Sequence, residues 1–91
     1  MSYEIRATIE MLRGSAETVD NNANTIRREV EAVRQLLDAL RPSFTGLRSE
    51  RFFSRFDQDY QSMQEWDRVV RSFAEEMRGA ADRFQAVENK D

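Results

Sequence analysis

Residues 41–46, Arg41-Pro42-Ser43-Phe44-Thr45-Gly46, divide the chain into two halves of similar length. Pro42 is the only proline among the 91 residues. Because proline has no N–H to donate and disfavours helical geometry in the residue before it, a helix from the N-terminal side should end near Leu40. Gly46 permits backbone conformations that other residues resist. The segment therefore predicts a turn at about 41–46.

On the N-terminal side of this turn, apolar residues recur at alternating steps of four and three. The steps average 3.5 residues, which is typical of the packed stripe of a supercoiled helix. The position after each stripe residue is mostly basic, and we expect this flank to face water. The pattern predicts a helix over about 4–40. Its stripe is Ile5, Ile9, Leu12, Ala16, Val19, Ala23, Ile26, Val30, Val33, Leu37 and Leu40, and its flank is Arg6, Arg13, Asp20, Arg27, Arg34 and Arg41.

The same spacing continues after the turn and predicts a second helix over about 47–88. Its stripe is Phe52, Phe56, Asp59, Met63, Trp66, Val70, Phe73, Met77, Ala80, Phe84 and Val87. Asp59 alone interrupts it. This carboxylate either pairs with an arginine across an interface or lies in water, and we favour water. The flank of this stripe is mostly apolar, with Phe53, Tyr60, Asp67, Ala74 and Ala81. A stripe this wide predicts contact with the hairpin mate and with a second chain.

The predicted fold class is all-α: an antiparallel two-helix hairpin, one domain over residues 1–91, that dimerises into a four-helix bundle. In a lone hairpin, Phe53, Tyr60, Trp66 and Phe73 should form an exposed patch larger than monomers usually tolerate. We therefore expect a homodimer, or a heterodimer with a related hairpin. The predicted interface consists of Phe53, Phe56, Tyr60, Met63, Trp66, Val70, Phe73 and Met77.

Charged residues also differ between the two ends of the predicted hairpin. Arginines gather around the turn, opposed only by Glu50, whereas acids gather toward the C-terminus. The arginines are Arg41, Arg48, Arg51 and Arg55, and the acids are Glu75, Glu76, Asp82, Glu88 and Asp91. Opposite charges at opposite ends favour an antiparallel pair of hairpins.

Composition excludes several classes of function. The chain has no cysteine and no histidine, so disulfides, thiolate or imidazole metal sites and Ser-His-Asp catalysis are absent. A two-helix hairpin supplies no pocket for acidic catalysis, so we expect no enzyme and no cofactor. A net charge of −3 gives no electrostatic case for nucleic acid. No apolar run reaches the length of a membrane span, and the N-terminus does not have the pattern of a signal peptide.

Two long helices joined at a central aromatic-x-Gly turn resemble the Trp-x-Gly (WXG) family of small proteins exported by type VII secretion systems. The turn motif here is Phe44-Thr45-Gly46, with Phe in place of Trp. The family's Tyr-x-x-x-Asp/Glu element near the end of the second helix corresponds to Phe84-Gln85-Ala86-Val87-Glu88, with Phe in place of Tyr. The resemblance covers the whole chain.

This resemblance implies dimers in which the turn of one subunit lies beside the C-terminal end of its partner. Turn and tail together would form an export signal, here Phe84 and Glu88 near Phe44 and Gly46 of the partner, read by a secretion ATPase. The chain would be made in the cytoplasm and secreted without a cleavable signal peptide, as a substrate or export partner of a type VII-like system. The alternative is an intracellular coiled-coil adaptor or chaperone that is not exported.

Overall fold

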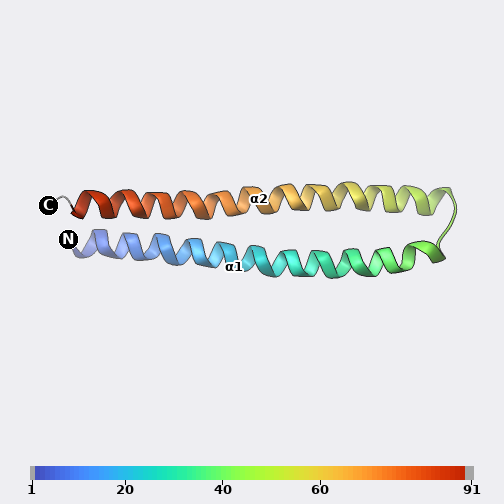
Figure 1. Ribbon diagram of the computed structural model, residues 1–91, viewed down its shortest axis with the longest axis horizontal. Coiled ribbons are helices and arrows are strands. Elements are labelled where there is room, and N and C mark those ends of the chain that lie inside the picture. Colours follow the sequence, from blue (N-terminus) through green and yellow to red (C-terminus); the bar gives the residue numbers. More distant parts are fainter. Residues whose placement is uncertain (1, 90–91) are drawn as a thin grey trace.

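The structure, a computed structural model, describes residues 2–89 and contains two long helices. Helix α1 spans Tyr3–Leu40, a short 3₁₀ turn spans Arg41–Ser43, and helix α2 spans Leu47–Asn89. The helices run antiparallel along their whole length, and both chain ends lie at the end of the hairpin opposite the turn (Figure 1). No strand occurs among the described residues. The predicted all-α helical hairpin is confirmed, as a rod 69 Å long and 16 × 14 Å across.

Local chemistry sets the limits of α1. At its start the hydroxyl oxygen of Ser2 accepts a hydrogen bond from the backbone N–H of Ile5 at 3.2 Å, which satisfies one of the free donors of the first turn. At its other end the helix stops at Leu40, and Pro42 lies in the 3₁₀ turn that follows. The expected effect of the proline is therefore confirmed.

The turn requires glycine at position 46 because of its backbone conformation, and not because a side chain would lack space there. Gly46 has φ +109°, a conformation that residues with a Cβ atom rarely adopt. A Cβ atom built there would meet nothing within 4 Å. The Gly46 carbonyl then accepts a hydrogen bond from the Glu50 N–H at 3.0 Å, which begins the hydrogen-bond ladder of α2.

Small residues allow the two helices to approach closely in the half of the rod near the chain ends. Ala16 and Ala23 of α1 and Ala74 and Ala81 of α2 are fully buried. An alanine side chain lies so near its own helix axis that a neighbouring helix must come close to cover it. Each pair is separated by one heptad, so each helix presents a single row of positions to the other.

The row that α2 presents to α1 is the predicted flank and not the predicted stripe. Phe53 is only 7% exposed, and Asp67, Ala74 and Ala81 are buried with it. Phe53 was expected in the exposed patch, and that expectation is wrong. About half of the predicted stripe residues come directly before a residue of this row, and these residues point outward instead. The large ones are Phe52, Trp66, Phe73 and Val87, all exposed.

Candidate interaction surface

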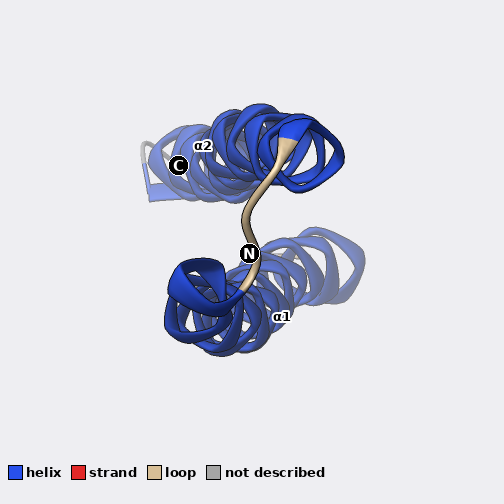
Figure 2. Ribbon diagram, turned by 90° about the vertical axis from the view of Figure 1, so that its right-hand side faces the viewer, coloured by secondary structure: helices blue, strands red, loops and turns tan. Residues whose placement is uncertain are grey.

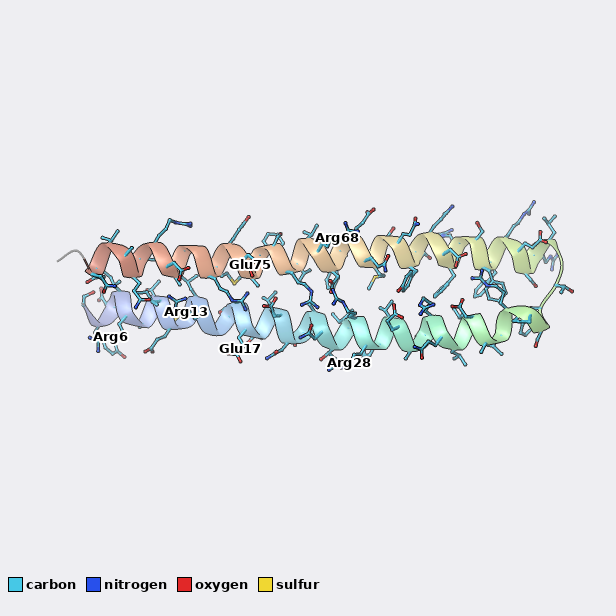
Figure 3. The ribbon with its side chains drawn as sticks, viewed as in Figure 1. Arg6, Arg13, Glu17, Arg28, Arg68 and Glu75 are labelled. Atoms are coloured by element: carbon cyan, nitrogen blue, oxygen red, sulfur yellow. The ribbon has the colours of Figure 1, made fainter. Side chains whose placement is uncertain are left out.

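One edge of the hairpin is closed by ion pairs that cross from α1 to α2. Arg13 contacts Asp82 at 2.9 Å, Asp20 contacts Arg78 at 2.6 Å, and Arg41 contacts Asp57 at 2.8 Å. The α1 members all belong to the flank that was expected to face water. That expectation holds for Arg6, Arg13 and Arg27, which are exposed. It fails for Asp20, Arg34 and Arg41, which are half-buried because antiparallel packing places this flank beside α2. The side chains that fill the space between the helices are visible in Figure 3.

Asp67 is the most deeply buried charge of this edge. Its carboxylate accepts hydrogen bonds from Arg27 of α1 and from Arg71 Nε, the latter at 3.0 Å. Arg71 also donates to the Asn24 side chain of α1 at 2.7 Å, so one network ties the two helices together. The hydrogen bond from Arg71 lowers the pKa of Asp67 most; burial opposes this, and the hydrogen bond from Arg27 reinforces it.

A second polar contact lies closer to the turn. The Tyr60 hydroxyl donates a hydrogen bond to Glu31, and the Arg34 guanidinium lies 5.6 Å from the centre of the Tyr60 ring. The hydrogen bond from Tyr60 lowers the pKa of Glu31, with help from Arg34. The same bond, together with burial, raises the pKa of Tyr60. The hydroxyl of Tyr60, a predicted interface residue, is thus hydrogen-bonded within the hairpin.

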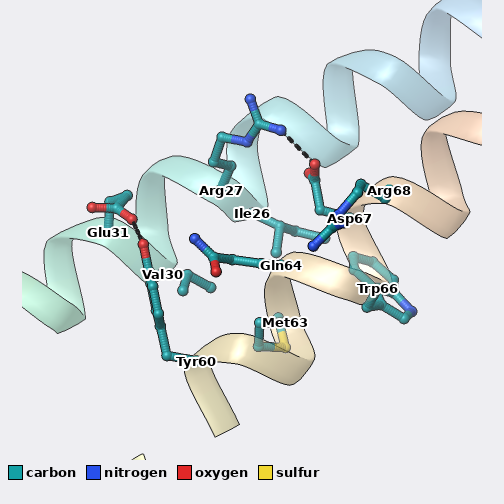
Figure 4. Close-up of a pocket in the computed structure, with 10 residues that line it drawn as sticks. All are labelled: Ile26, Arg27, Val30, Glu31, Tyr60, Met63, Gln64, Trp66, Asp67 and Arg68. Atoms are coloured by element: carbon teal, nitrogen blue, oxygen red, sulfur yellow. Dashed lines mark hydrogen bonds and ion pairs between the residues drawn. The ribbon is translucent and has the colours of Figure 1, made fainter. Parts of the chain in front are cut away.

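The opposite edge of the hairpin has no such closure. A cavity of about 530 Å³ lies between the helices and is lined by both apolar and polar side chains (Figure 4). The expectation that a two-helix hairpin supplies no pocket is therefore wrong. A second, mostly apolar hollow of about 290 Å³ continues this cavity toward the turn. They share Val30, Tyr60 and Met63 as walls. Trp66, at the rim of the first, is 44% exposed, so this edge presents apolar surface to solvent.

This open apolar edge is defined by its exposed side chains. They come from the α2 stripe and from the turn-proximal part of the α1 stripe. They are Val33 and Leu40 of α1 and Phe52, Met63, Trp66, Phe73, Phe84 and Val87 of α2. The polar exception, Asp59, is exposed and lies 3.6 Å from Arg55 of its own helix, so the interpretation that it faces water is confirmed for the hairpin.

The predicted turn motif and tail motif lie far apart in one chain. Phe44, Thr45 and Gly46 are exposed at one end of the rod, and Phe84 and Glu88 lie near the other (Figure 1). Phe84 is 46% exposed, whereas Glu88 is half-buried. The hairpin by itself therefore does not bring the two motifs together.

The exposed area of the chain is large for its mass. The accessible surface is 7103 Å² for a 10.7 kDa chain. A compact monomer of this mass would expose about 5,500 Å². The radius of gyration is 20.4 Å, against about 12 Å for a compact domain of this length. Figure 2, viewed along the rod, shows the cause, since the described chain places one helix against one other and covers neither elsewhere.

Residues 2–89 place no group of three or more His, Cys, Asp or Glu side chains where it could hold a metal ion. In the same range, neither helix is long and apolar enough to cross a membrane.

The ion pairs were the part of this surface that sequence reasoning missed. Their signal is the opposite charge of residues that an antiparallel pairing centred near residue 48 brings level, such as Arg41 with Asp57 and Arg13 with Asp82. Comparing the two halves of the chain position by position from the turn outward would have exposed it.

These contacts define the class of protein as a small two-helix hairpin with one edge closed by ion pairs and one edge left apolar. The sequence matches the WXG100 family, described as proteins of 100 residues with WXG, over residues 4–89. The chain belongs to this family, which confirms the resemblance drawn from the turn and the helices. No curated protein and no solved structure matches it.

Membership in the WXG100 family indicates the general class of protein to which the chain belongs. WXG100 proteins are small, non-enzymatic helical proteins associated with type VII secretion, and they typically form dimers. Phe44, the residue predicted to replace the family's Trp, is exposed and follows the 3₁₀ turn in extended conformation.

Proposed function

We propose that the protein is a substrate or export partner of a type VII-like secretion system and acts as an antiparallel dimer, a four-helix bundle. The open apolar edge carries this proposal. The accessible surface of 7103 Å² exceeds that of a compact monomer by about 1,600 Å². Covering that much on each of two copies would bury about 3,000 Å² in total, the size of an obligate interface.

Charge supports the antiparallel arrangement. Arg48 and Arg51 lie exposed near the turn, and Glu76 lies exposed toward the other end of the rod. Arg41 and Arg55 were expected to be opposed only by Glu50, but they pair with Asp57 and Asp59, and Asp82 pairs with Arg13. Asp91, counted with Glu76 and Asp82 in the sequence, lies outside the described residues. An antiparallel pair places the basic end of one hairpin beside the acidic end of the other. Contacts of this kind steer association and orientation more than they add affinity.

The dimer also supplies a reason for the separation of the two motifs. In an antiparallel pair, Phe44 and Gly46 of one copy lie next to Phe84 and Glu88 of the other, so that a complete export signal exists only in the dimer. Phe84 and Glu88 are one helical turn apart on α2, and a secretion ATPase would read them as an aromatic anchor with a charge beside it.

Orientation can be tested with single spin labels, because the chain has no cysteine of its own. Ser54→Cys and Ser72→Cys are matched changes at exposed positions of α2. In an antiparallel dimer the two labels at position 54 lie about 40 Å apart along the rod, and those at position 72 about 12 Å apart. In a parallel dimer both pairs would show similarly short distances, which would refute the proposed arrangement.

Export is tested in cells that carry a type VII system. Phe84→Ala and Glu88→Gln should give folded, dimeric protein that stays in the cell. Glu65→Gln, at an exposed acid in the middle of α2, serves as the control and should be exported normally. Normal export of both signal variants would remove the proposed role of Phe84 and Glu88. A wild-type chain that is never exported would favour the intracellular adaptor or chaperone instead.

A further inference from the structure

We propose that the 530 Å³ cavity between the helices is a docking pocket for Phe73 of a second copy of this chain, and that the two copies of Trp66 lie on either side of the dimer axis. This inference rests on the proposed dimer and deepens it by naming the pocket, its occupant and the position of the two-fold axis.

The cavity lies where the hairpin packs least well. Fully buried alanines hold the helices together near the chain ends, but in the middle of the rod Ile26 and Val30 face Met63 and Asp67. Figure 4 shows the polar contacts of Arg27 with Asp67 and of Glu31 with Tyr60 among the lining residues, with Met63 and Trp66 beside them. The cavity is partly open to solvent, and its apolar walls include the exposed face of Trp66. Water there makes none of the close packing contacts that an apolar side chain would make. An apolar group from outside would supply those contacts.

The position of the cavity points to a second copy as its occupant. If two hairpins overlap along their full length, an antiparallel two-fold axis crosses each α2 at its midpoint, which for Leu47–Asn89 is Arg68. Phe73 comes five residues after this midpoint. In the second copy it is therefore level with Met63, five residues before it, and Met63 lines both hollows.

Phe73 also faces the correct direction. It follows Trp66 by one heptad, so both lie on the same side of α2, and Phe73 is 53% exposed. Trp66 lies only about 3 Å along the helix from the midpoint, so the two indoles flank the axis. The resulting order along the dimer is Phe73, Trp66 of the second copy, Trp66, and Phe73 of the second copy. Such a central aromatic cluster is typical of interface hot spots.

Sedimentation equilibrium of Phe73→Ala tests the proposal. The dimer should weaken by at least about 30-fold relative to wild type, while helicity by circular dichroism stays unchanged. Met11→Ala is the control, because Met11 is an exposed apolar residue away from this edge, and its dimer affinity should stay within about twofold of wild type. Trp66, the sole tryptophan, provides a second readout. Its emission should shift to the red and its quenching by acrylamide should rise when the wild-type dimer is diluted into monomer.

Phe73→Trp separates a roomy pocket from a tight contact. A cavity of about 530 Å³ has space for the larger indole, so this variant should dimerise within about fivefold of wild type. Severe weakening by Phe73→Trp would overturn the assignment of the cavity, as would Phe73→Ala with wild-type affinity. A wild-type chain that stays monomeric at all concentrations would overturn the self-dimer, while the export test of Phe84 and Glu88 would still judge the proposed function.

Discussion

Replacing Asp67 tests whether the ion-pair edge holds the hairpin in its observed packing. The Asp67 side chain is 11% exposed and accepts hydrogen bonds from Arg27 and Arg71. Hydrogen bonds to charged groups contribute about 1.5–3 kcal/mol each. Arg27 and Arg71 are 59% and 27% exposed, so water can solvate both after the carboxylate is removed, which lowers the cost. Asp67→Ala should therefore reduce the free energy of unfolding by about 1.5–3 kcal/mol in total.

Asp67→Leu is expected to behave differently. The site lies in an otherwise apolar row between Tyr60 and Ala74, and an apolar side chain of suitable size often replaces a buried ion pair at no cost. Urea unfolding followed by circular dichroism, at one fixed protein concentration, measures both variants. Glu65→Ala, at an exposed acid of α2, is the control and should change stability by less than about 0.5 kcal/mol. A loss below 0.5 kcal/mol for Asp67→Ala, or equal losses for Ala and Leu, would refute the reasoning.

Three further predictions follow from the pKa shifts and the glycines. The pKa of Asp67 is lowered in the folded chain, so the contribution of its carboxylate to folding stability is complete above the unfolded value of about 3.8 and is lost as pH falls through the folded pKa. Urea unfolding between pH 5 and pH 2 should therefore show less acid destabilisation in Asp67→Leu than in wild type. The raised pKa of Tyr60 has the opposite sign: the stabilisation is complete below the unfolded value of about 10 and is lost as pH rises through the folded pKa. Ultraviolet titration should find one tyrosine whose pKa is above the ordinary value of about 10, and this pKa should fall in Glu31→Gln. An unchanged pKa in Glu31→Gln would contradict the hydrogen bond. Gly46→Ala should destabilise by about 1–3 kcal/mol through backbone strain. Gly14→Ala, inside α1, also adds a methyl group where there is open space, and it should stabilise the fold by about 0.5–1 kcal/mol. Thermal unfolding measures both variants, and stability changes of the same sign would exclude strain at the turn.

The helices and the turn were readable from the sequence because local chemistry determines them. Proline ends α1 at Leu40, glycine supplies the positive φ at position 46, and the regular apolar spacing extends through both helices. The structure has α1 at Tyr3–Leu40 and α2 at Leu47–Asn89, against predicted ranges of about 4–40 and about 47–88.

The face that α2 turns toward α1 was not readable from spacing alone. The Phe52 series and the Phe53 series are adjacent rows of one wide stripe, and both satisfy the helical period. The structure buries the less apolar row, which contains Asp67, and this rotation brings Arg71 and Arg78 beside Asn24 and Asp20 of α1. Such a choice depends on pairs of residues on different helices, whereas a periodicity within one helix carries no information about them.

The same rotation explains why part of the predicted interface lies inside the hairpin. The Arg41 guanidinium lies over the Phe53 ring, 4.7 Å from the ring centre, and the Tyr60 hydroxyl donates a hydrogen bond to Glu31. Trp66 and Phe73 remain at the surface, where they are available to a second chain. The sequence thus indicated that α2 has two apolar sides, and the structure determines which side each residue is on.

Solution mass and shape together test the central claim that the open apolar edge is covered by a second copy. Light scattering across a concentration series, combined with small-angle X-ray scattering, gives both quantities. We predict a particle of twice the 10.7 kDa chain mass. Because side-by-side hairpins are only about 10 Å apart, the radius of gyration should be about 21 Å, hardly above the 20.4 Å of the single chain. A mass of 10.7 kDa at every concentration, or a dimer with a much larger radius from end-to-end contact, would contradict the account.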